Sequence, residues 1–219
     1  EGVGQQILRE ITILQRCSHE NIVRLIEIAV EVEPKDSNSD RDGDQKPEPQ
    51  TEHIPRLFLV FEFIEHDLVG VLDVIKEGTV SRFKRIGVRE MSSYAKQILR
   101  AIAYMHRLNI MHRDLKCSNI LLSNRNVVKV ADFGLSRDLS RAPIRRYDDD
   151  RYDRILSAQV MALWYKPPEL LKRQPYGLAA DMWCIGCMFA EMFAGKTPFY
   201  CEEEKKSEQL NRIRKMMDN

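Results

Sequence analysis

Three polar residue types that could act together in catalysis stand close to one another in residues 112–119, which read His-Arg-Asp-Leu-Lys-Cys-Ser-Asn. Asp114 can accept the proton of an attacking hydroxyl, and Lys116 can place a cation beside a migrating phosphate. Asn119 can give magnesium an oxygen ligand. The chemistry that these residue types support at this spacing is phosphoryl transfer.

Two further motifs follow the first one along the chain. Asp132-Phe133-Gly134 stands between apolar residues, and Lys-Pro-Pro-Glu occupies 166–169. A short charged motif alone is weak evidence, but HRDxxxxN, DFG and a PPE form of APE in this order are a strong joint signal. On these motifs the chain resembles a eukaryotic protein kinase catalytic domain.

The composition is that of a globular chain with balanced charge. Its 219 residues are 43% hydrophobic and 31% charged, enough for one sizeable domain or two small ones. Lys+Arg 34 against Asp+Glu 33 gives a net charge of +1, which argues against a general nucleic-acid binder. No apolar run has the length of a membrane span, and no signal peptide is recognised. We therefore expect no direct nucleic-acid contact, no membrane contact and no secretion.

The five cysteines form an odd, unpatterned set, which indicates a reducing compartment. Cys184 and Cys187 have the spacing of a metal or redox motif, but no second pair is present to complete a zinc site. They lie in an apolar stretch, so we interpret them as two buried helix residues.

Helical and strand patterns alternate in the first part of the chain. Ile7, Ile11 and Leu14 recur at helical spacing and predict a helix. Strand-like runs at 23–32 and 56–63 predict a hairpin, joined by the polar stretch 31–54, which we expect to be a disordered loop. The apolar run 57–61 is typical of a buried strand.

Helices dominate the prediction for the remaining residues. In chain order the expected elements are a helix at 68–75, an amphipathic helix at 91–105, a strand at 127–131, a charged loop at 138–157, a turn-rich segment at 160–169, an apolar helix from Asp181 to Phe193 ending at Gly195, and a polar helix at 202–219 with Leu210, Ile213 and Met217 on one side.

Three segments narrow the resemblance to the cyclin-dependent kinases. Residues 8–11 resemble the helix that these kinases offer to their cyclin, 60–68 resemble their hinge, and 163–171 resemble their substrate segment. The Pro-Pro form, the hinge exit at 66–70 and the sequence 116–119 are similar to the transcription-associated branch. Members of that branch phosphorylate the repeat tail of RNA polymerase II and pair with K- or T-type cyclins.

The resemblance implies an α+β, protein-kinase-like two-lobe fold. Residues 1–66 would form a partial small lobe of one helix and two strands, and residues 67–219 a mostly helical large lobe. The family pattern places a glycine-rich phosphate loop and a nucleotide-orienting lysine before residue 1, and further helices after residue 219. We therefore expect a fragment of a kinase domain, with the apolar sides of the first helix and of residues 57–61 exposed.

The resemblance also implies roles for individual residues. Asp114 would be the catalytic base, Lys116 would steady the phosphate, and Glu10 would pair with the nucleotide-orienting lysine. Asn119 and Asp132 would hold magnesium. The residues implied in nucleotide binding are Phe61 at the back of the adenine pocket, Glu62 and Ile64 in the hinge, Asp67 at the ribose, Leu121 at the pocket floor, and Asp132. Asp181 would brace the catalytic loop from below. Outside a kinase, Phe61 and Leu121 would simply be core residues and Glu10 an exposed helix carboxylate.

A regulatory phosphate is implied as well. Ser157 stands where the family carries its activating phosphorylated residue, and Arg9, Arg113 and Arg137 match the arginines that clasp that phosphate. The alternative is an ordinary exposed loop serine, with Tyr152 as another acceptor in the same loop.

Two substitutions depart from the family pattern. Ala162 stands where the family usually has a threonine whose hydroxyl bonds the catalytic aspartate. Lys166 replaces the usual arginine, and a lysine cannot reproduce a planar fork of donors.

Together the motifs and the resemblance predict a cyclin-activated serine/threonine kinase. It would use ATP and Mg²⁺, act on Ser/Thr-Pro sites such as those of the RNA polymerase II tail, and work in the nucleus or otherwise in the cytoplasm. The alternative is a catalytically inactive, kinase-like binding module for a cyclin or scaffold. Intact Asp114, Asn119 and Asp132 favour the enzyme, whereas Ala162 and the absence of the nucleotide-orienting lysine favour the module.

Overall fold

The computed structural model describes residues 3–31, 56–77, 87–141, 144–146, 152–154, 156, 160–200 and 206–218. These residues combine helices with small antiparallel sheets, which confirms the predicted α+β class. They form two compact units, residues 24–62 and residues 1–23 with 63–219. Ser157 and the expected disordered loop, apart from Glu31, lie outside the described residues, so both remain predictions.

The smaller unit is a hairpin of two antiparallel strands. β1 (Leu25–Glu31) pairs with β2 (Arg56–Phe61), with Leu25 opposite Phe61 and Ile28 opposite Leu59. At the end of the ladder the Arg24 N–H donates to Glu62 Oε1 at 2.8 Å, and the Glu62 N–H donates to the Arg24 carbonyl at 3.0 Å. The predicted pairing of the two strands is therefore confirmed.

Both strands of this hairpin expose apolar side chains. Ile26 and Val30 are each 56% exposed, and Phe58 is 49% exposed. Strands in one ladder lie side by side, so a face is buried only when another layer packs against it. The sequence pattern predicted that the strand at 57–61 is buried, and this prediction is wrong. The family resemblance predicted an exposed apolar side on the same strand, and the structure shows it.

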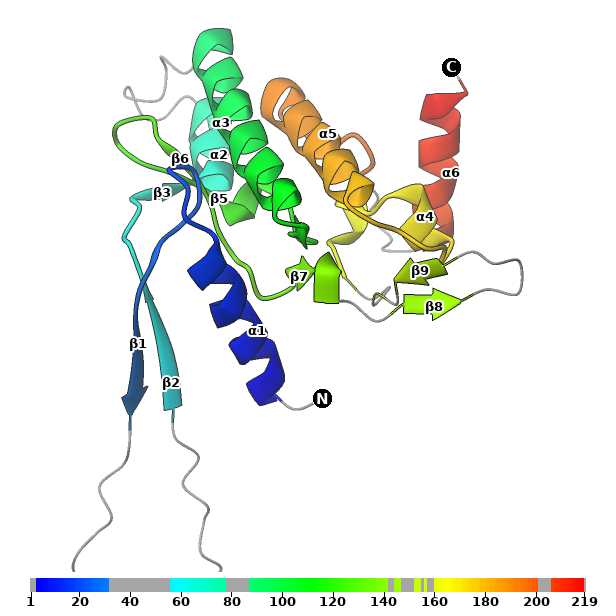
Figure 1. Cartoon of the computed structure of the whole chain (residues 1–219). Coiled ribbons are helices and arrows are strands. Elements are labelled where there is room, and N and C mark those ends of the chain that lie inside the picture. The colour runs from blue at the N-terminus through cyan, green and yellow to red at the C-terminus, as the bar shows by residue number, and fades with distance from the viewer. Residues whose placement is uncertain are drawn as a thin grey trace, which may run out of the picture. The chain divides into compact units, whose positions relative to one another are not determined.

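The helix α1 (Val3–Arg16) belongs to the larger unit and confirms the first predicted helix. It buries Ile13 and Leu14, while Leu8 remains 63% exposed. α1 packs against β7 (Arg137–Asp138), as Figure 1 shows. The compact units therefore do not follow the boundary expected at residue 66, and the division into a small and a large lobe remains a prediction.

α2 (Leu68–Glu77) and α3 (Val88–Arg107) agree with the helices predicted at 68–75 and 91–105. The Glu90 carboxylate accepts a hydrogen bond from the Gly87 N–H at 2.8 Å and so caps the start of α3. The apolar stripe of α3 is fully buried, including Tyr94, Ile98 and Met105. The buried stripe holds α3 against the core. α3 is followed by β4 (Ile110–Met111) and then by residues 112–119, which we call the catalytic loop after the role that the resemblance implies.

Two small antiparallel sheets frame the catalytic loop. β3 (His66–Asp67), β5 (Ile120–Leu122) and β6 (Val128–Val130) form one sheet in the order β3-β5-β6. β4 pairs with β7 in the other. The short helix η2 (Cys117–Asn119) joins the catalytic loop to β5, and β6 confirms the strand predicted at 127–131.

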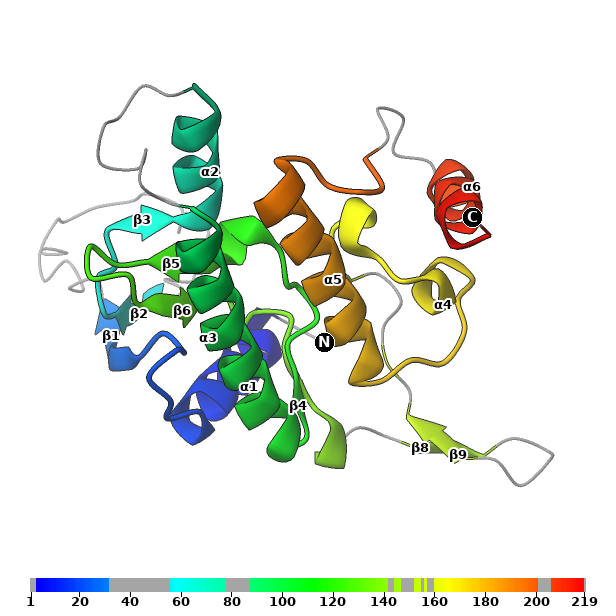
Figure 2. The same cartoon turned by 90° about the horizontal axis from the view of Figure 1, so that it is seen from above.

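The helix α5 (Ala179–Ala194) runs beside α3 (Figure 2) and confirms the predicted apolar helix. It ends at Gly195, whose φ of 74° is a left-handed conformation that favours glycine. Cys184 and Cys187 are buried in α5, as interpreted from the sequence, and Cys17 and Cys117 are buried elsewhere in the larger unit.

Residues 138–171 contain more short helices and strands than the sequence predicted. Within 138–157, expected to be a loop, lie the short helix η3 (Leu139–Arg141) and a hairpin of β8 (Ile144–Arg146) and β9 (Tyr152–Arg154). The turn-rich segment contains η4 (Leu163–Tyr165) and leads to α4 (Pro168–Leu171).

The helix α6 (Lys206–Met217) confirms the last predicted helix but not its full apolar side. Ile213 is buried, whereas Met217 is 69% exposed. The amide residue Gln209 is fully buried as well, and α6 packs against α4 and η4. Within the part of the chain that the structure describes, no helix has the length and apolar character needed to cross a membrane.

Candidate active site

The catalytic loop gathers its three predicted residues around one carboxylate. Lys116 Nζ lies 2.9 Å from Asp114 Oδ2, and the Asn119 amide donates to the same oxygen at 3.0 Å. The Asn119 amide also donates to the Asp114 carbonyl at 2.8 Å. Because η2 turns the chain back between Lys116 and Asn119, both side chains reach Asp114, whose side chain is largely buried but still partly accessible. A substrate hydroxyl could therefore reach a carboxylate that is held in place from two sides.

A buried carboxylate of α5 supports the loop from below. Asp181 accepts hydrogen bonds from the backbone N–H groups of His112 and Arg113, each at 2.9 Å. His106 Nε2 lies 2.9 Å from the same carboxylate. Asp181 is completely buried, so these contacts replace the water that a carboxylate otherwise needs. The contact that the resemblance implied for Asp181 is present.

Arg113 shows that the loop is strained where Asp181 holds it. Its φ of 69° is left-handed, a conformation that is unfavourable for a residue with a long side chain. Strain of this kind persists only where the surroundings fix the backbone, and such places cluster at functional sites. The Asp181 contacts supply that constraint next to Asp114.

Asp132 and Asn119 meet at one end of the β5–β6 ladder. Ile120 pairs with Val130, so Asn119 just before β5 and Asp132 just after β6 lie at the same edge. The Ala131 N–H donates to the Asn119 carbonyl at 2.9 Å and ties the two segments together. Asp132 has a left-handed φ of 64°, and Phe133 beside it is buried against the His112 ring.

This pair of residues fits a magnesium ion in its chemistry. The Asn119 amide nitrogen is engaged by Asp114, which leaves its carbonyl oxygen as the ligand atom. Asp132 adds a carboxylate, and oxygen atoms of these two kinds are the ligands that magnesium prefers. The predicted metal-binding pair is therefore brought together by the fold, although its role remains a prediction.

Glu10 of α1 and Asp132 both have a carboxylate oxygen close to Gly134. A methyl group placed on Gly134 would stand 3.7 Å from Glu10 Oε2 and 3.4 Å from Asp132 Oδ1. Burial, and then the charge of Asp132, raise the pKa of the Glu10 carboxyl above its ordinary value. Two carboxylates this close repel each other, so a cation bound near them would be stabilised. The structure thus brings Glu10 close to Asp132, and its pairing with a lysine remains a prediction.

The predicted nucleotide-binding residues fall into two groups. Asp67 and Leu121 lie opposite each other in the β3–β5 pair, and Asp67 accepts a hydrogen bond from the Gly70 N–H at 2.9 Å. Ile64 is half-buried in the same unit. Phe61 and Glu62 belong to the smaller unit, so the structure does not join them to the catalytic loop. Their roles in adenine binding remain predictions.

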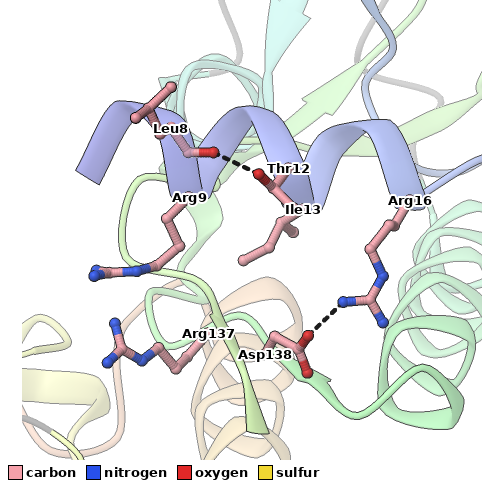
Figure 3. Close-up of a pocket in the computed structure, with 7 residues that line it drawn as sticks. All are labelled: Leu8, Arg9, Thr12, Ile13, Arg16, Arg137 and Asp138. Carbon is pink, nitrogen blue, oxygen red and sulfur yellow. Dashed lines mark hydrogen bonds and ion pairs between the residues drawn. The ribbon is translucent and has the colours of Figure 1, made fainter. Parts of the chain in front are cut away.

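Two of the predicted regulatory arginines line a groove of about 290 Å³ between α1 and β7. Figure 3 shows the guanidinium groups of Arg9 and Arg137 on the same side of this groove. Arg113 is buried nearby and donates to the Leu135 carbonyl at 2.7 Å and to the Tyr176 hydroxyl at 3.3 Å. Burial raises the pKa of the Tyr176 hydroxyl, and the hydrogen bond and charge of Arg113, together with the charge of Arg137, oppose that shift. The structure therefore brings Arg9 and Arg137 to one groove, while the regulatory role of all three arginines remains a prediction.

The two departures from the family pattern lie on the substrate side. Ala162 precedes η4 and offers no hydroxyl to Asp114. Lys166 is buried, and burial followed by the charge of Lys206 lowers the pKa of its ammonium group. Met161, directly before Ala162, has a left-handed φ of 67°, so the backbone at that point is strained.

Two contacts near the site were not predicted from the sequence. Arg16 binds Asp138, and the Tyr165 hydroxyl donates to the Glu191 carboxylate. The partners are 122 and 26 residues apart, so no helical or strand period connects them. The sequence offered one hint, the charged Arg16 at the end of the first predicted helix. It did not indicate that Asp138 would be the partner.

Comparison with known proteins adds a family and several relatives. The family model described as protein kinase domain matches residues 1–219. Cyclin-dependent kinase C-2 of Arabidopsis thaliana is 38% identical over 97% of this chain and 37% of its own length. Cyclin-dependent kinase 12 of Drosophila melanogaster is 36% identical over 99% of this chain and 16% of its own. Cyclin-dependent kinase 9 of Homo sapiens is 38% identical over 88% of this chain and 45% of its own.

These matches confirm the predicted resemblance to the transcription-associated cyclin-dependent kinases and the kinase-like fold. The chain spans less than half of the length of each of these relatives.

Proposed function

Because the chain belongs to the protein kinase family, we propose that it acts as a serine/threonine kinase of the cyclin-dependent type. It would transfer the γ-phosphate of ATP to serine or threonine residues followed by proline. The observation that carries this proposal is the convergence of Lys116 and Asn119 on Asp114 Oδ2, at 2.9 and 3.0 Å. A base, a cation and a magnesium ligand in one loop are the groups that phosphoryl transfer requires.

Asp114 would accept the proton of the substrate hydroxyl while that oxygen attacks the phosphorus atom. The Asn119 amide orients the carboxylate, and Asp181 holds the loop backbone through His112 and Arg113. Since these contacts exist before the substrate binds, little reorganisation accompanies the transfer. Lys116 would stabilise the negative charge of the phosphoryl group.

Asn119 and Asp132 would hold magnesium at the edge of the β5–β6 ladder. Bound magnesium neutralises charge on the nucleotide phosphates. The two side chains would hold that ion, and the Asn119 amide also contacts Asp114.

A cyclin would be the activating partner, of K or T type, and it would dock on α1. Leu8, in the segment that resembles the cyclin-facing helix, is 63% exposed and so is available for such a contact. The RNA polymerase II tail would be the substrate, and the nucleus the place of action. The resemblance of 8–11, 60–68 and 163–171 supports this choice, as do the names of the relatives.

Phosphorylation of Ser157 would regulate the enzyme. A phosphate carries a charge of about −1.5 to −2 and orders a loop when arginines surround it. Arg9 and Arg137 line one groove, and Arg113 contacts Tyr176; these cations support the proposal that they would bind such a phosphate. In the full-length protein bound to its cyclin, we expect Ser157→Ala to lower activity, and mass spectrometry to find phosphate on Ser157 in active protein. Unchanged activity and an unmodified Ser157 would contradict this part of the proposal.

The main test measures two quantities on the natural full-length protein with a cyclin. One is the affinity for ATP by calorimetry, and the other is phosphate incorporation into a Ser-Pro repeat peptide with magnesium. We expect Asp114→Asn to abolish transfer with ATP affinity nearly unchanged, because Asp114 serves the substrate hydroxyl. Asp73→Asn is the matched control, since Asp73 pairs with Lys76 on the exposed side of α2.

The alternative is the inactive binding module, and Ala162 is the observation in its favour. Cyclin binding without any transfer by the unaltered protein would establish the module and overturn the enzyme. Equal transfer by the unaltered protein and Asp114→Asn would show that another group acts as the base.

A further inference from the structure

An ion pair joins the last turn of α1 to β7, at the start of the segment that leads towards Ser157. Arg16 Nη1 lies 2.5 Å from Asp138 Oδ2, as Figure 3 shows at the end of the groove. The Asp138 side chain is 9% exposed and that of Arg16 is 34% exposed. Since the carboxylate is largely removed from water, the pair is screened less than a surface ion pair.

Further hydrogen bonds fix both partners in place. The Ser140 N–H donates to Asp138 Oδ1 at 2.9 Å, and the Ser140 hydroxyl donates to the same oxygen. Arg16 Nη2 donates to the Leu108 carbonyl at the end of α3 at 3.3 Å. Burial acts against ionisation of Asp138, but the bonds from Ser140 and Arg16 outweigh it and lower its pKa. The ion pair therefore has a defined geometry on both sides.

The position of Asp138 connects this pair to the catalytic loop. Asp138 pairs with Ile110 in the β4–β7 ladder, and β4 leads directly into His112 and the loop. At the other end of α1, Gln6 Nε2 donates to the Gly134 carbonyl at 3.2 Å. The helix is therefore attached near both ends to the segment that runs from Gly134 to Asp138.

Glu10 lies on α1 between Gln6 and Arg16, the two residues that make these contacts, so its position depends on both of them. Its carboxylate and that of Asp132 both lie close to Gly134, and the two repel each other. Repulsion alone would move α1 away from the catalytic segment. A contact that joins opposite charges at the end of the same helix opposes this movement.

We propose that Arg16 and Asp138 are positioning residues for phosphoryl transfer, and that their ion pair fixes α1 so that Glu10 stays beside Asp132. They touch neither substrate nor nucleotide in this role and act through Glu10. The inference rests on the proposed kinase function for its kinetic consequence, but the position of α1 is a property of the fold and can be measured by itself.

The kinetic test uses the natural full-length protein with its cyclin. We expect Asp138→Asn to lower kcat/KM roughly fivefold to tenfold, as for the loss of one partly buried charged contact. Arg16→Lys keeps the charge and should lose less than Arg16→Gln. Combined with Glu10→Gln, Asp138→Asn should have almost no further effect, because both changes remove the same alignment. Asp73→Asn, in an exposed ion pair, serves as the matched control with unchanged kcat/KM.

The structural test follows amide hydrogen exchange in α1. We expect Asp138→Asn to speed exchange over residues 10–17 by roughly the same factor as the kinetic loss, with no change in α5. Additive effects of Asp138→Asn and Glu10→Gln on kcat/KM, or unchanged exchange in α1, would overturn the inference. If the unaltered protein transfers no phosphate, the proposed function fails, and the exchange measurement still decides whether the ion pair holds α1.

Discussion

Asn119 holds the backbone and the side chain of Asp114 together. Its amide nitrogen donates to both the carbonyl and the carboxylate of Asp114, at 2.8 and 3.0 Å. An asparagine side chain has one nitrogen and one oxygen, so this arrangement leaves the oxygen for the metal ion that we propose. One residue would therefore orient the proposed base and supply a ligand to the proposed metal.

At the residue scale, Ala162 provides the sharpest kinetic prediction. A threonine hydroxyl here would donate to the carboxylate of Asp114, as the family resemblance implies. A hydrogen bond to a charged group contributes about 1.5–3 kcal/mol, or roughly ten- to a hundredfold in rate if it acts in the transition state alone. In the full-length protein, Ala162→Thr should raise kcat by up to that factor, measured on a Ser-Pro peptide. A flat or lower kcat with unchanged folding would show that Asn119 and Lys116 already orient the base fully.

Asp138 gives a prediction for stability against pH. Its pKa is held below the ordinary value of 3.8 in the folded chain, although burial alone would raise it. A carboxyl with a depressed folded pKa stabilises the fold above its unfolded pKa, and this contribution is lost as the pH falls through the folded pKa. Because Arg16 is partly exposed, the contribution is about 1 kcal/mol.

The free energy of unfolding should therefore differ between the unaltered protein and Asp138→Asn at pH 6, and the difference should shrink towards pH 3. Urea unfolding at a series of pH values measures both curves. Parallel curves over this range would mean that Asp138 has the same pKa in the folded and unfolded chain.

The sequence predicted the residues that form motifs and missed those that form isolated contacts. Asp114, Asn119 and Asp132 could be found because each has a fixed distance from its neighbours in a motif. Arg16 and Asp138 are separated by 122 residues, and their meeting depends on how α1 and the β4–β7 ladder pack. No local pattern carries that information.

At the element scale, the end of α5 depends on one glycine. Gly195 has a φ of 74°, where a side chain is strained whatever space surrounds it. Gly195→Ala should destabilise the fold by about 1 kcal/mol. Gly186 is the matched control, because it lies inside the same helix with open space around it, and alanine is the better helix former there. Gly186→Ala should be neutral or stabilising, and thermal or urea unfolding compares the two. Equal effects of both substitutions would refute this account of the helix end.

The connection between α5 and the catalytic loop can be tested at Asp181. Asparagine has one acceptor oxygen where the carboxylate has two, so Asp181→Asn leaves a backbone N–H of His112 or Arg113 without its partner. The loop should shift, and kcat should fall by roughly ten- to a hundredfold with KM for ATP little changed. Steady-state kinetics separates the two constants. A rise in KM for ATP with unchanged kcat would show that Asp181 supports the nucleotide site instead.

Long helices were predicted well, and short strands were not. α3 and α5 have a buried stripe or a sustained apolar run, and either pattern is readable over many residues. β3, β4 and β7 have two residues each, which is too short for any alternation to show. The β8–β9 hairpin lies within a charged run that indicated a loop.

At the scale of the whole molecule, the residues that we propose for acid–base chemistry and metal binding belong to one compact unit. Asp114, Asn119, Asp132 and Glu10 all lie in residues 1–23 and 63–219. Phe61 and Glu62 lie in the hairpin of residues 24–62. The sequence predicted both groups through the family resemblance, but composition and periodicity could not show that α1 would join the unit that carries the catalytic loop.

The buried cysteines make this chain a reporter of its own unfolding. Burial raises the pKa of Cys17 to about 11 and that of Cys187 to about 12, and it raises the pKa of Cys117 and Cys184 as well. The thiolate is the form that reacts with an alkylating reagent, so these thiols should resist iodoacetamide at neutral pH while the chain is folded.

Peptide-resolved mass spectrometry after a timed pulse of reagent would measure the alkylation of each thiol. Alkylation at Cys117 and Cys184 should follow the unfolding rate of the larger unit and speed up with urea. Rapid alkylation of both in the folded chain would contradict their burial. Because Cys17 sits just after α1 and Cys184 within α5, the order in which they react would show which part of the molecule opens first.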